Sequence, residues 1–156
     1  MDKPLRLPPS LNEGDSIVHL GGTVDVFSVC LRIWGDDLNP DEISTLMQAT
    51  PTSAHRKGDI DRSGMYDRIE DVGKWHFDLD RDPSATLNDL VDRLLNSLTA
   101  DLAIWQALKQ RYHLDVFCGL RMEHWNRGTS LLPQTMIRLG ERGLELGLDI
   151  YYVVKK

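Results

Sequence analysis

The chain has 156 residues, of which 41% are hydrophobic and 27% charged, and this composition is typical of one globular domain that buries a core. Its formal net charge of -6 argues against binding to nucleic acid or to anionic membranes, because both need a basic surface. The beginning of the chain holds no long apolar run, so we expect no signal peptide or membrane anchor and a cytoplasmic location.

The N-terminal segment is rich in proline and polar residues, and we expect residues 1–22 to form a loose arm or an edge segment. Within it, the short apolar run at residues 16–20 could add an edge strand. Residues 23–156 are predicted to form a single α+β domain.

A strand is predicted over residues 27–34, because apolar residues alternate there with residues of another kind. One face carries Phe27, Val29, Leu31 and Ile33, and the other carries Ser28, Cys30, Arg32 and Trp34. After a turn, Asn39 can cap a short helix that has Pro40 at its first position and ends before Pro51.

The next stretch, residues 52–72, is polar and about twenty residues long, a length that often marks a functional loop or local disorder. Part of it, around residues 54–59, is predicted to pair as a strand. Residues 75–79 alternate again, with Trp75, Phe77 and Leu79 pointing inward, and this pattern predicts another strand.

Apolar residues then recur at helical spacing from residue 87 to residue 112. One helix over this range would be roughly 39 Å long, about the diameter of the domain. Thr99 and Asp101 could cap a second helix, so we expect two helices with a break near residues 98–100. A strand at 114–122, a helix from Pro133 to about Gly143 and a strand at 144–154 follow.

This order of elements predicts a mostly antiparallel or mixed sheet of four to six strands, with helices packed on one face. The strands around Val29, Phe77, Val116 and Ile150 should lie in one sheet. The residues expected to be buried are Phe27, Val29, Leu31, Ile33, Ile43, Leu46, Leu90, Leu94, Val116, Leu120, Leu139 and Ile150.

The two cysteines, Cys30 and Cys118, both fall in predicted strands and form no paired motif. We expect both to be reduced thiols in a cytoplasmic protein, although a disulfide between neighbouring strands is an open alternative.

Motifs that carry chemistry are missing from the sequence. The five histidines are scattered without metal-ligand spacing, and no nucleophile elbow or glycine-rich phosphate loop is present. We therefore expect no metal, no cofactor and no catalytic residue; the sequence favours a protein that is not an enzyme but leaves the question open.

One candidate binding site remains, the loop at residues 52–59. Its cations and hydroxyl could hold an anionic group through charge-assisted hydrogen bonds. The candidate residues are Thr52, Arg56, Lys57 and Asp59 of the loop, with Trp34 and Trp75 nearby. The competing interpretation is structural: Lys57-Gly58-Asp59 is also a good tight turn, in which Lys57 is solvated or pairs with a nearby acid.

Several short segments in register resemble a bacterial family, the domain-of-unknown-function family 4279, over residues 27–154. The segments are LRIWGDDLNPDEIS, ATPTSAHRKGD, GKWHFDL and LELGLDIYYV. The matching residues are Pro40, Asp41, Glu42, Ile43, Pro51, Thr52, Lys57, Gly58, Asp59, Gly73, Lys74 and Trp75. The resemblance implies no settled activity and no catalytic residues.

Two classes of function agree with the sequence. The first is a non-catalytic protein-binding module, immunity- or antitoxin-like, whose partner is another bacterial protein. The second is a small domain that binds an anionic ligand, or an undiscovered enzyme, using the 52–59 loop. A deep pocket lined by Trp34, Trp75 and Lys57 would favour the second class, and a flat patch the first. The sequence leaves homo-oligomer formation open.

Overall fold

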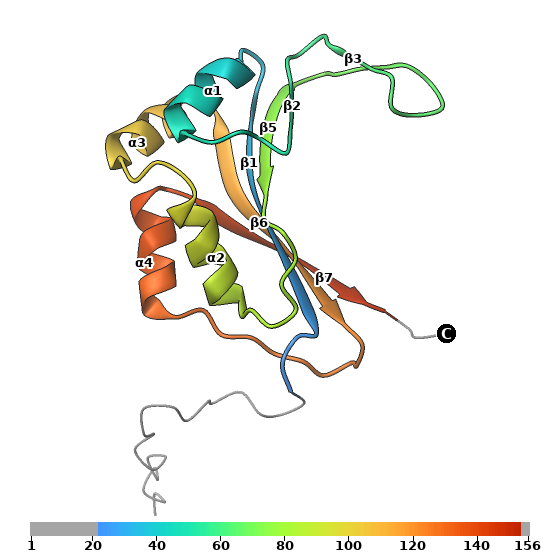
Figure 1. Ribbon diagram of the computed structural model, residues 1–156, viewed down its shortest axis with the longest axis vertical. Coiled ribbons are helices and arrows are strands. Elements are labelled where there is room, and N and C mark those ends of the chain that lie inside the picture. The colour runs from blue at the N-terminus through green and yellow to red at the C-terminus, as the bar shows by residue number, and fades with distance from the viewer. Residues whose placement is uncertain (1–21, 154–156) are drawn as a thin grey trace, which may run out of the picture.

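The computed structural model describes residues 22–153, in which four helices accompany a five-stranded mixed sheet and a separate two-stranded sheet (Figure 1). The predicted single-domain α+β fold is confirmed. The expected arm at residues 1–22 lies outside the described residues except for Gly22. Val154, where the last predicted strand ends, also lies outside them.

The elements follow the predicted order, with one additional hairpin. They are β1 (Val26–Gly35), α1 (Pro40–Met47), β2 (Ser53–His55), β3 (Ile60–Asp61), β4 (Arg68–Ile69), β5 (Gly73–Asp78), α2 (Leu87–Asn96), α3 (Leu102–Arg111), β6 (His113–Met122), α4 (Pro133–Glu141) and β7 (Glu145–Tyr152). The strand expected around residues 54–59 is thus the short β2, and the rest of the polar stretch contains the β3–β4 hairpin.

The order of strands in the main sheet is β2-β5-β1-β6-β7, with β1 at the centre and antiparallel to both of its neighbours. β7 lies parallel to β6, and a parallel neighbour requires a crossover connection, which α4 supplies. α2 and α3 likewise carry the chain from β5 to β6 across β1. The helices lie together on one side of the sheet (Figure 1).

Capping residues set the helix boundaries. The Asn39 side chain accepts a hydrogen bond from the Asp41 N–H at 3.1 Å, and Thr86 and Asp89 form a reciprocal capping box on α2. The Asp101 carboxylate accepts from the Ala103 N–H at 2.9 Å and begins α3. The apolar stripe from 87 to 112 is therefore two helices, as predicted.

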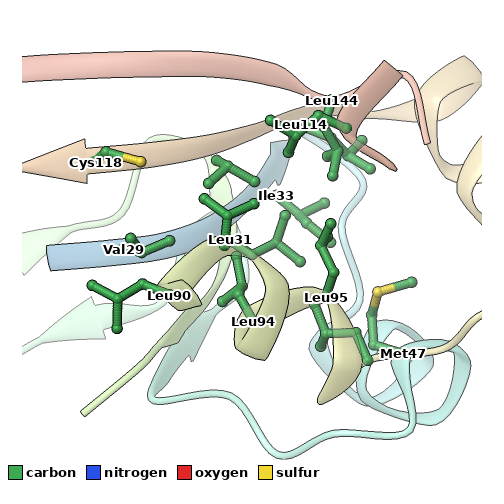
Figure 2. Packing of buried hydrophobic residues seen from close by; sticks show 14 of the residues in the cluster. Val29, Leu31, Ile33, Met47, Leu90, Leu94, Leu95, Leu114, Cys118 and Leu144 are labelled. Atoms are coloured by element: carbon green, nitrogen blue, oxygen red, sulfur yellow. The ribbon is translucent and has the colours of Figure 1, made fainter. Parts of the chain in front are cut away.

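The hydrophobic core lies between the sheet and the helices. Figure 2 shows Val29, Leu31 and Ile33 of β1 beside Leu90, Leu94 and Leu95 of α2. Among the predicted core residues, those buried are Phe27, Val29, Leu31, Ile33, Ile43, Leu90, Leu94, Val116, Leu120 and Leu139. Leu46 is only partly buried against this cluster.

Ile150 was predicted to be buried, and this prediction is wrong: the residue is 58% exposed. The alternation in β7 is real, and Ile150 lies opposite the buried Leu120 of β6. However, β7 is an edge strand whose C-terminal half extends past the helices (Figure 1).

Both cysteines are free thiols, as predicted. Cys30 pairs with Phe117 and Val29 with Cys118, so the two thiols lie on opposite faces of neighbouring strands and cannot reach each other. Burial raises the pKa of the Cys118 thiol to about 12 and also raises that of Cys30.

Candidate functional site

The face of the sheet that points away from the helices carries an ordered set of polar and aromatic side chains. They alternate along β1, β5 and β6 with the core residues, and the strand register places them in rows. This surface, called the open face below, consists of Cys30, Arg32 and Trp34 of β1, Lys74, His76 and Asp78 of β5, and His113, Asp115 and Phe117 of β6.

Arg32 lies at the centre of the open face and forms a two-pronged ion pair with Asp115. Arg32 Nε donates to Asp115 Oδ1 at 2.8 Å, and Nη2 donates to Oδ2. The Asp115 side chain is 9% exposed and that of Arg32 31%, so the pair is largely shielded from solvent. The hydrogen bonds to Asp115 raise the pKa of Arg32, which fixes the guanidinium in its charged form.

Aromatic rings surround this guanidinium. Its carbon lies 4.1 Å from the centroid of Phe117 and 5.5 Å from that of Trp34, which are cation–π distances. The Trp34 ring in turn stacks on His113, with centroids 5.6 Å apart and planes inclined by 19°. These contacts join Arg32, Trp34, Phe117 and His113, which come from β1 and β6, into one continuous row of side chains.

His76 lies beside Arg32 on β5 and is half-buried. Its pKa is lowered, first by burial and then by the neighbouring charges of Arg32 and Lys74, although Asp78 opposes this effect. The imidazole is therefore neutral at pH 7. Arg32, Trp34, Lys74 and His76, together with Asp71, line a shallow concavity of about 390 Å³.

The residues predicted from the 52–59 loop have structural partners within the protein. Thr52 Oγ1 accepts a hydrogen bond from the Asp78 N–H at 2.8 Å. Arg56 donates to the Asn39 side chain at 2.7 Å and so holds the loop against the start of α1. Lys57 Nζ lies 2.8 Å from the Asp36 carboxylate, and both side chains are exposed.

The Lys57-Gly58-Asp59 segment forms the turn that leads into the β3–β4 hairpin. Gly58 has φ +89°, a left-handed conformation that favours glycine, and its N–H donates to the Glu70 carbonyl at 2.7 Å. The Asp59 carboxylate accepts from the Arg56 N–H at 2.8 Å and closes the turn. The geometry matches the structural interpretation of this segment.

The structure does not bring the six predicted site residues together. Trp34 lies on the open face, whereas Trp75 is fully buried on the opposite face of the sheet and donates its indole N–H to Ser44 at 3.0 Å. A pocket lined by Trp34, Trp75 and Lys57 is thus ruled out by the alternation of side chains in paired strands.

Sequence reasoning missed Glu70, a buried carboxylate at the base of the β3–β4 hairpin. Arg68 donates to it at 2.8 Å, His55 Nε2 lies 3.0 Å away and Lys74 Nζ 4.0 Å away. It borders a wide concavity of about 820 Å³, which Gly58 and Asp59 also line. No sequence pattern marks Glu70, because its partners come from β2, β4 and β5.

Sequence reasoning also missed Arg32, His76 and Phe117 as members of a site. A signal for Arg32 was present: it and Trp34 alternate with core residues, and large or charged side chains on the second face of a strand can mark a binding surface. The others follow only from the strand order.

Within residues 22–153, no three His, Cys, Asp or Glu side chains gather closely enough to hold a metal ion. No helix in that range is long and apolar enough to cross a membrane.

Comparison with known proteins matches the chain to a protein family. No curated protein and no solved structure matches the chain. A family model described as "Domain of unknown function (DUF4279)" matches residues 25–153, which include every helix and strand of the structure. The chain therefore belongs to the DUF4279 family.

Proposed function

We propose that this protein is a non-catalytic protein-binding module that presents its open face to a partner protein. The observation that carries the proposal is the row of Trp34, Arg32 and Phe117 on a sheet face without helices. Tryptophan and arginine are enriched among the residues that contribute most to protein–protein affinity, and aromatic residues in general are enriched in interfaces.

The row is also held in place before any partner binds. The bidentate contact with Asp115 and the stack on His113 fix the rotamers of Arg32 and Trp34. Binding then costs little side-chain entropy at these positions, which favours affinity. A shallow surface of this kind suits a protein better than a small molecule, because small ligands bind in clefts that cover most of their surface.

The charges of the open face support a binding role rather than catalysis. Burial and the nearby Asp78 raise the pKa of Cys30, so that its side chain stays a thiol at neutral pH and is a weak nucleophile. The cation Arg32 is matched by Asp115, and Lys74 Nζ lies 4.0 Å from the Glu70 carboxylate, so both cations of the open face have an anionic partner within the protein.

From the net charge of -6 we infer a basic partner, since complementary charge favours association. An immunity- or antitoxin-like module that neutralises a basic bacterial protein in the cytoplasm would use this acidity to attract its partner. This specific role rests on the small size, the acidity and the family of the chain.

The test uses a matched pair of tryptophan variants. Affinity capture with the full chain identifies a partner, starting with the products of adjacent genes, and the purified partner is then titrated calorimetrically. We expect Trp34→Ala to weaken binding roughly 30-fold or more, the effect of a central hot spot. Trp125→Ala is the control, because Trp125 is 84% exposed and lies in the loop after β6, away from the open face.

Both variants should melt near the wild-type temperature, since neither tryptophan belongs to the core. Lost affinity in Trp125→Ala with full affinity in Trp34→Ala would move the binding surface away from the open face and refute the proposal.

The second candidate, binding of a small anion by the 52–59 loop, has one observation in its favour: Gly58 and Asp59 line the concavity of about 820 Å³. Inorganic phosphate and small carboxylates are the probes, read as a rise in melting temperature. A rise that disappears in Lys57→Ala, with the melting of the variant itself unchanged, would support this candidate. No rise with any probe would reject it.

A further inference from the structure

The edge strand β7 carries large apolar side chains that residues 22–153 leave uncovered. Leu148, Ile150 and Tyr152 are 48%, 58% and 58% exposed and lie on one face of the strand, while Tyr151 on the other face is also exposed. An edge strand of eight residues with this composition is a template for pairing with another strand.

The opposite edge of the sheet is different. β2 has only three residues, Ser53–His55, and contains no exposed large apolar side chain. Proteins commonly prevent unwanted pairing by making an edge strand short and polar. That protection is present at β2. On β7 the one charged residue between the exposed apolar residues is Asp149, and its carboxylate accepts a hydrogen bond from the Tyr151 hydroxyl.

The direction of the backbone in β7 follows from its pairing with β6. The Val153 N–H donates to the Met122 carbonyl at 2.8 Å, so the odd-numbered residues of β7 direct their backbone groups toward β6. The even-numbered residues, Leu148, Ile150 and Tyr152, therefore direct theirs toward solvent. The exposed apolar side chains therefore belong to the same residues as the backbone groups that residues 22–153 leave unpaired.

We propose that a second copy of this chain pairs with β7, antiparallel and around a two-fold axis at Ile150, to form a homodimer with one continuous ten-stranded sheet. In this register Ile150 lies opposite Ile150 of the second copy, and Leu148 lies opposite Tyr152. The outward backbone groups of these residues face one another, as hydrogen-bonded antiparallel pairs require. This inference does not depend on the proposed function.

Asp149 favours the register with the two-fold axis at Ile150 over the register with the axis at Asp149 itself. With the axis at Asp149 instead, the two Asp149 carboxylates would lie directly opposite each other, which is destabilising. With the axis at Ile150, Asp149 lies opposite Tyr151 of the second copy, so that a phenol hydroxyl faces a carboxylate. Two antiparallel copies of β7 therefore match each other in their apolar pairs, Ile150 with Ile150 and Leu148 with Tyr152, and in their polar pair, Asp149 with Tyr151.

The first experiment measures the mass of the full-length protein in solution by light scattering over a concentration series. We expect the wild type to have twice the mass of one chain, and Ile150→Lys to be a monomer, because it places two ammonium groups at the axis. Ile69→Lys is the matched control, since Ile69 is 70% exposed in β4, away from β7, and this variant should remain a dimer.

The second experiment tests the register by cysteine crosslinking in a Cys30→Ser background, where Cys118 is buried. Ile150→Cys should form a disulfide-linked dimer under mild oxidation, because hydrogen-bonded antiparallel pairs have Cα atoms about 5.5 Å apart. Leu148→Cys should not, since its copies would be about 13 Å apart along the strands. Asp149→Cys should not crosslink efficiently either.

A wild type that is monomeric throughout the concentration series overturns the proposal. A dimer that survives Ile150→Lys shows that another surface pairs, and also overturns it. If only a variant lacking residues 1–21 dimerises, that segment covers β7 in the full chain and the proposal is again rejected. Crosslinking at residue 148 or 149 without crosslinking at 150 overturns the register.

Discussion

Two ion pairs show how burial decides what a charged residue contributes to this protein. Asp115 holds Arg32 through two hydrogen bonds, largely shielded from solvent, whereas Asp36 meets Lys57 with both side chains exposed. Losing one partner of a shielded pair destabilises the folded protein, because the remaining charge cannot be fully hydrated. An exposed pair contributes little to the free energy of unfolding, because water has a high dielectric constant.

We therefore expect Asp115→Ala to lower the free energy of unfolding by about 1–3 kcal/mol, a range moderated by the partial exposure of Arg32. Asp36→Ala should change it by about 0–1 kcal/mol, since it deletes only a surface pair. Urea denaturation of both variants measures the difference. Equal losses in the two variants would contradict the assignment of Arg32 and Asp115 as a shielded pair.

His76 predicts a dependence of stability on pH. Its pKa is lowered in the folded protein, mainly by burial, so the unfolded chain binds a proton more readily than the folded protein does. Stability should then be fully present well above about pH 6.5, the ordinary pKa of histidine, and be lost as the pH falls from there through the lowered pKa of the folded protein.

The check is the melting temperature measured between about pH 7.5 and about pH 5.5, a range above the titration of ordinary carboxylates. His76→Gln should melt with a smaller decrease over this range than the wild type. His124→Gln, a change in the loop after β6, is the control and should keep the wild-type decrease. An unchanged profile in His76→Gln would exclude His76 as the cause.

At the scale of elements, local patterns predicted most of the fold. Alternation identified β1, β5, β6 and β7, and helical spacing with caps identified α1, α2, α3 and α4. The β3–β4 hairpin was not predicted, because its strands are two residues each and carry no periodicity. The burial of Ile150 in β7 was predicted wrongly, since alternation reveals which side chains share a face but not whether a helix covers that face.

α2 is the element whose buried face most directly covers β1. Leu94 is fully buried there beside Leu31 (Figure 2), so Leu94→Ala should lower the free energy of unfolding by about 2–5 kcal/mol through lost burial and a cavity. Leu102→Ala, at the exposed start of α3, should cost less than about 1 kcal/mol. Denaturation midpoints at constant slope measure both, and similar losses would contradict the packing.

At the scale of the whole molecule, the open face shows what a sequence cannot supply by itself. Trp34 was identified from its own strand, but Phe117 and His76 join it only because β6 and β5 flank β1 in a particular register. Strand order depends on crossovers between segments that are far apart in the chain. Local periodicity therefore predicts the face on which a side chain lies, and tertiary structure decides its neighbours.

The position of Cys118 makes it a reporter of how the whole molecule opens. Its side chain is fully buried on the helix side of β6, and its raised pKa keeps it a thiol, so alkylation requires the helices to separate from the sheet. In a Cys30→Ser background, the labelling rate under native conditions should follow the population of the open form. Mass spectrometry of the alkylated protein measures this rate.

Leu94→Ala should then speed the labelling of Cys118 by roughly 30-fold or more, the factor that a loss of about 2 kcal/mol implies. Leu102→Ala is the control and should leave the rate within a few-fold of the wild type, because its side chain is not part of the core. If Cys118 were labelled at the same rate in all three proteins, the thiol would be reached by a local fluctuation of β6 and β7. The sheet and α2 would then not open as one cooperative unit.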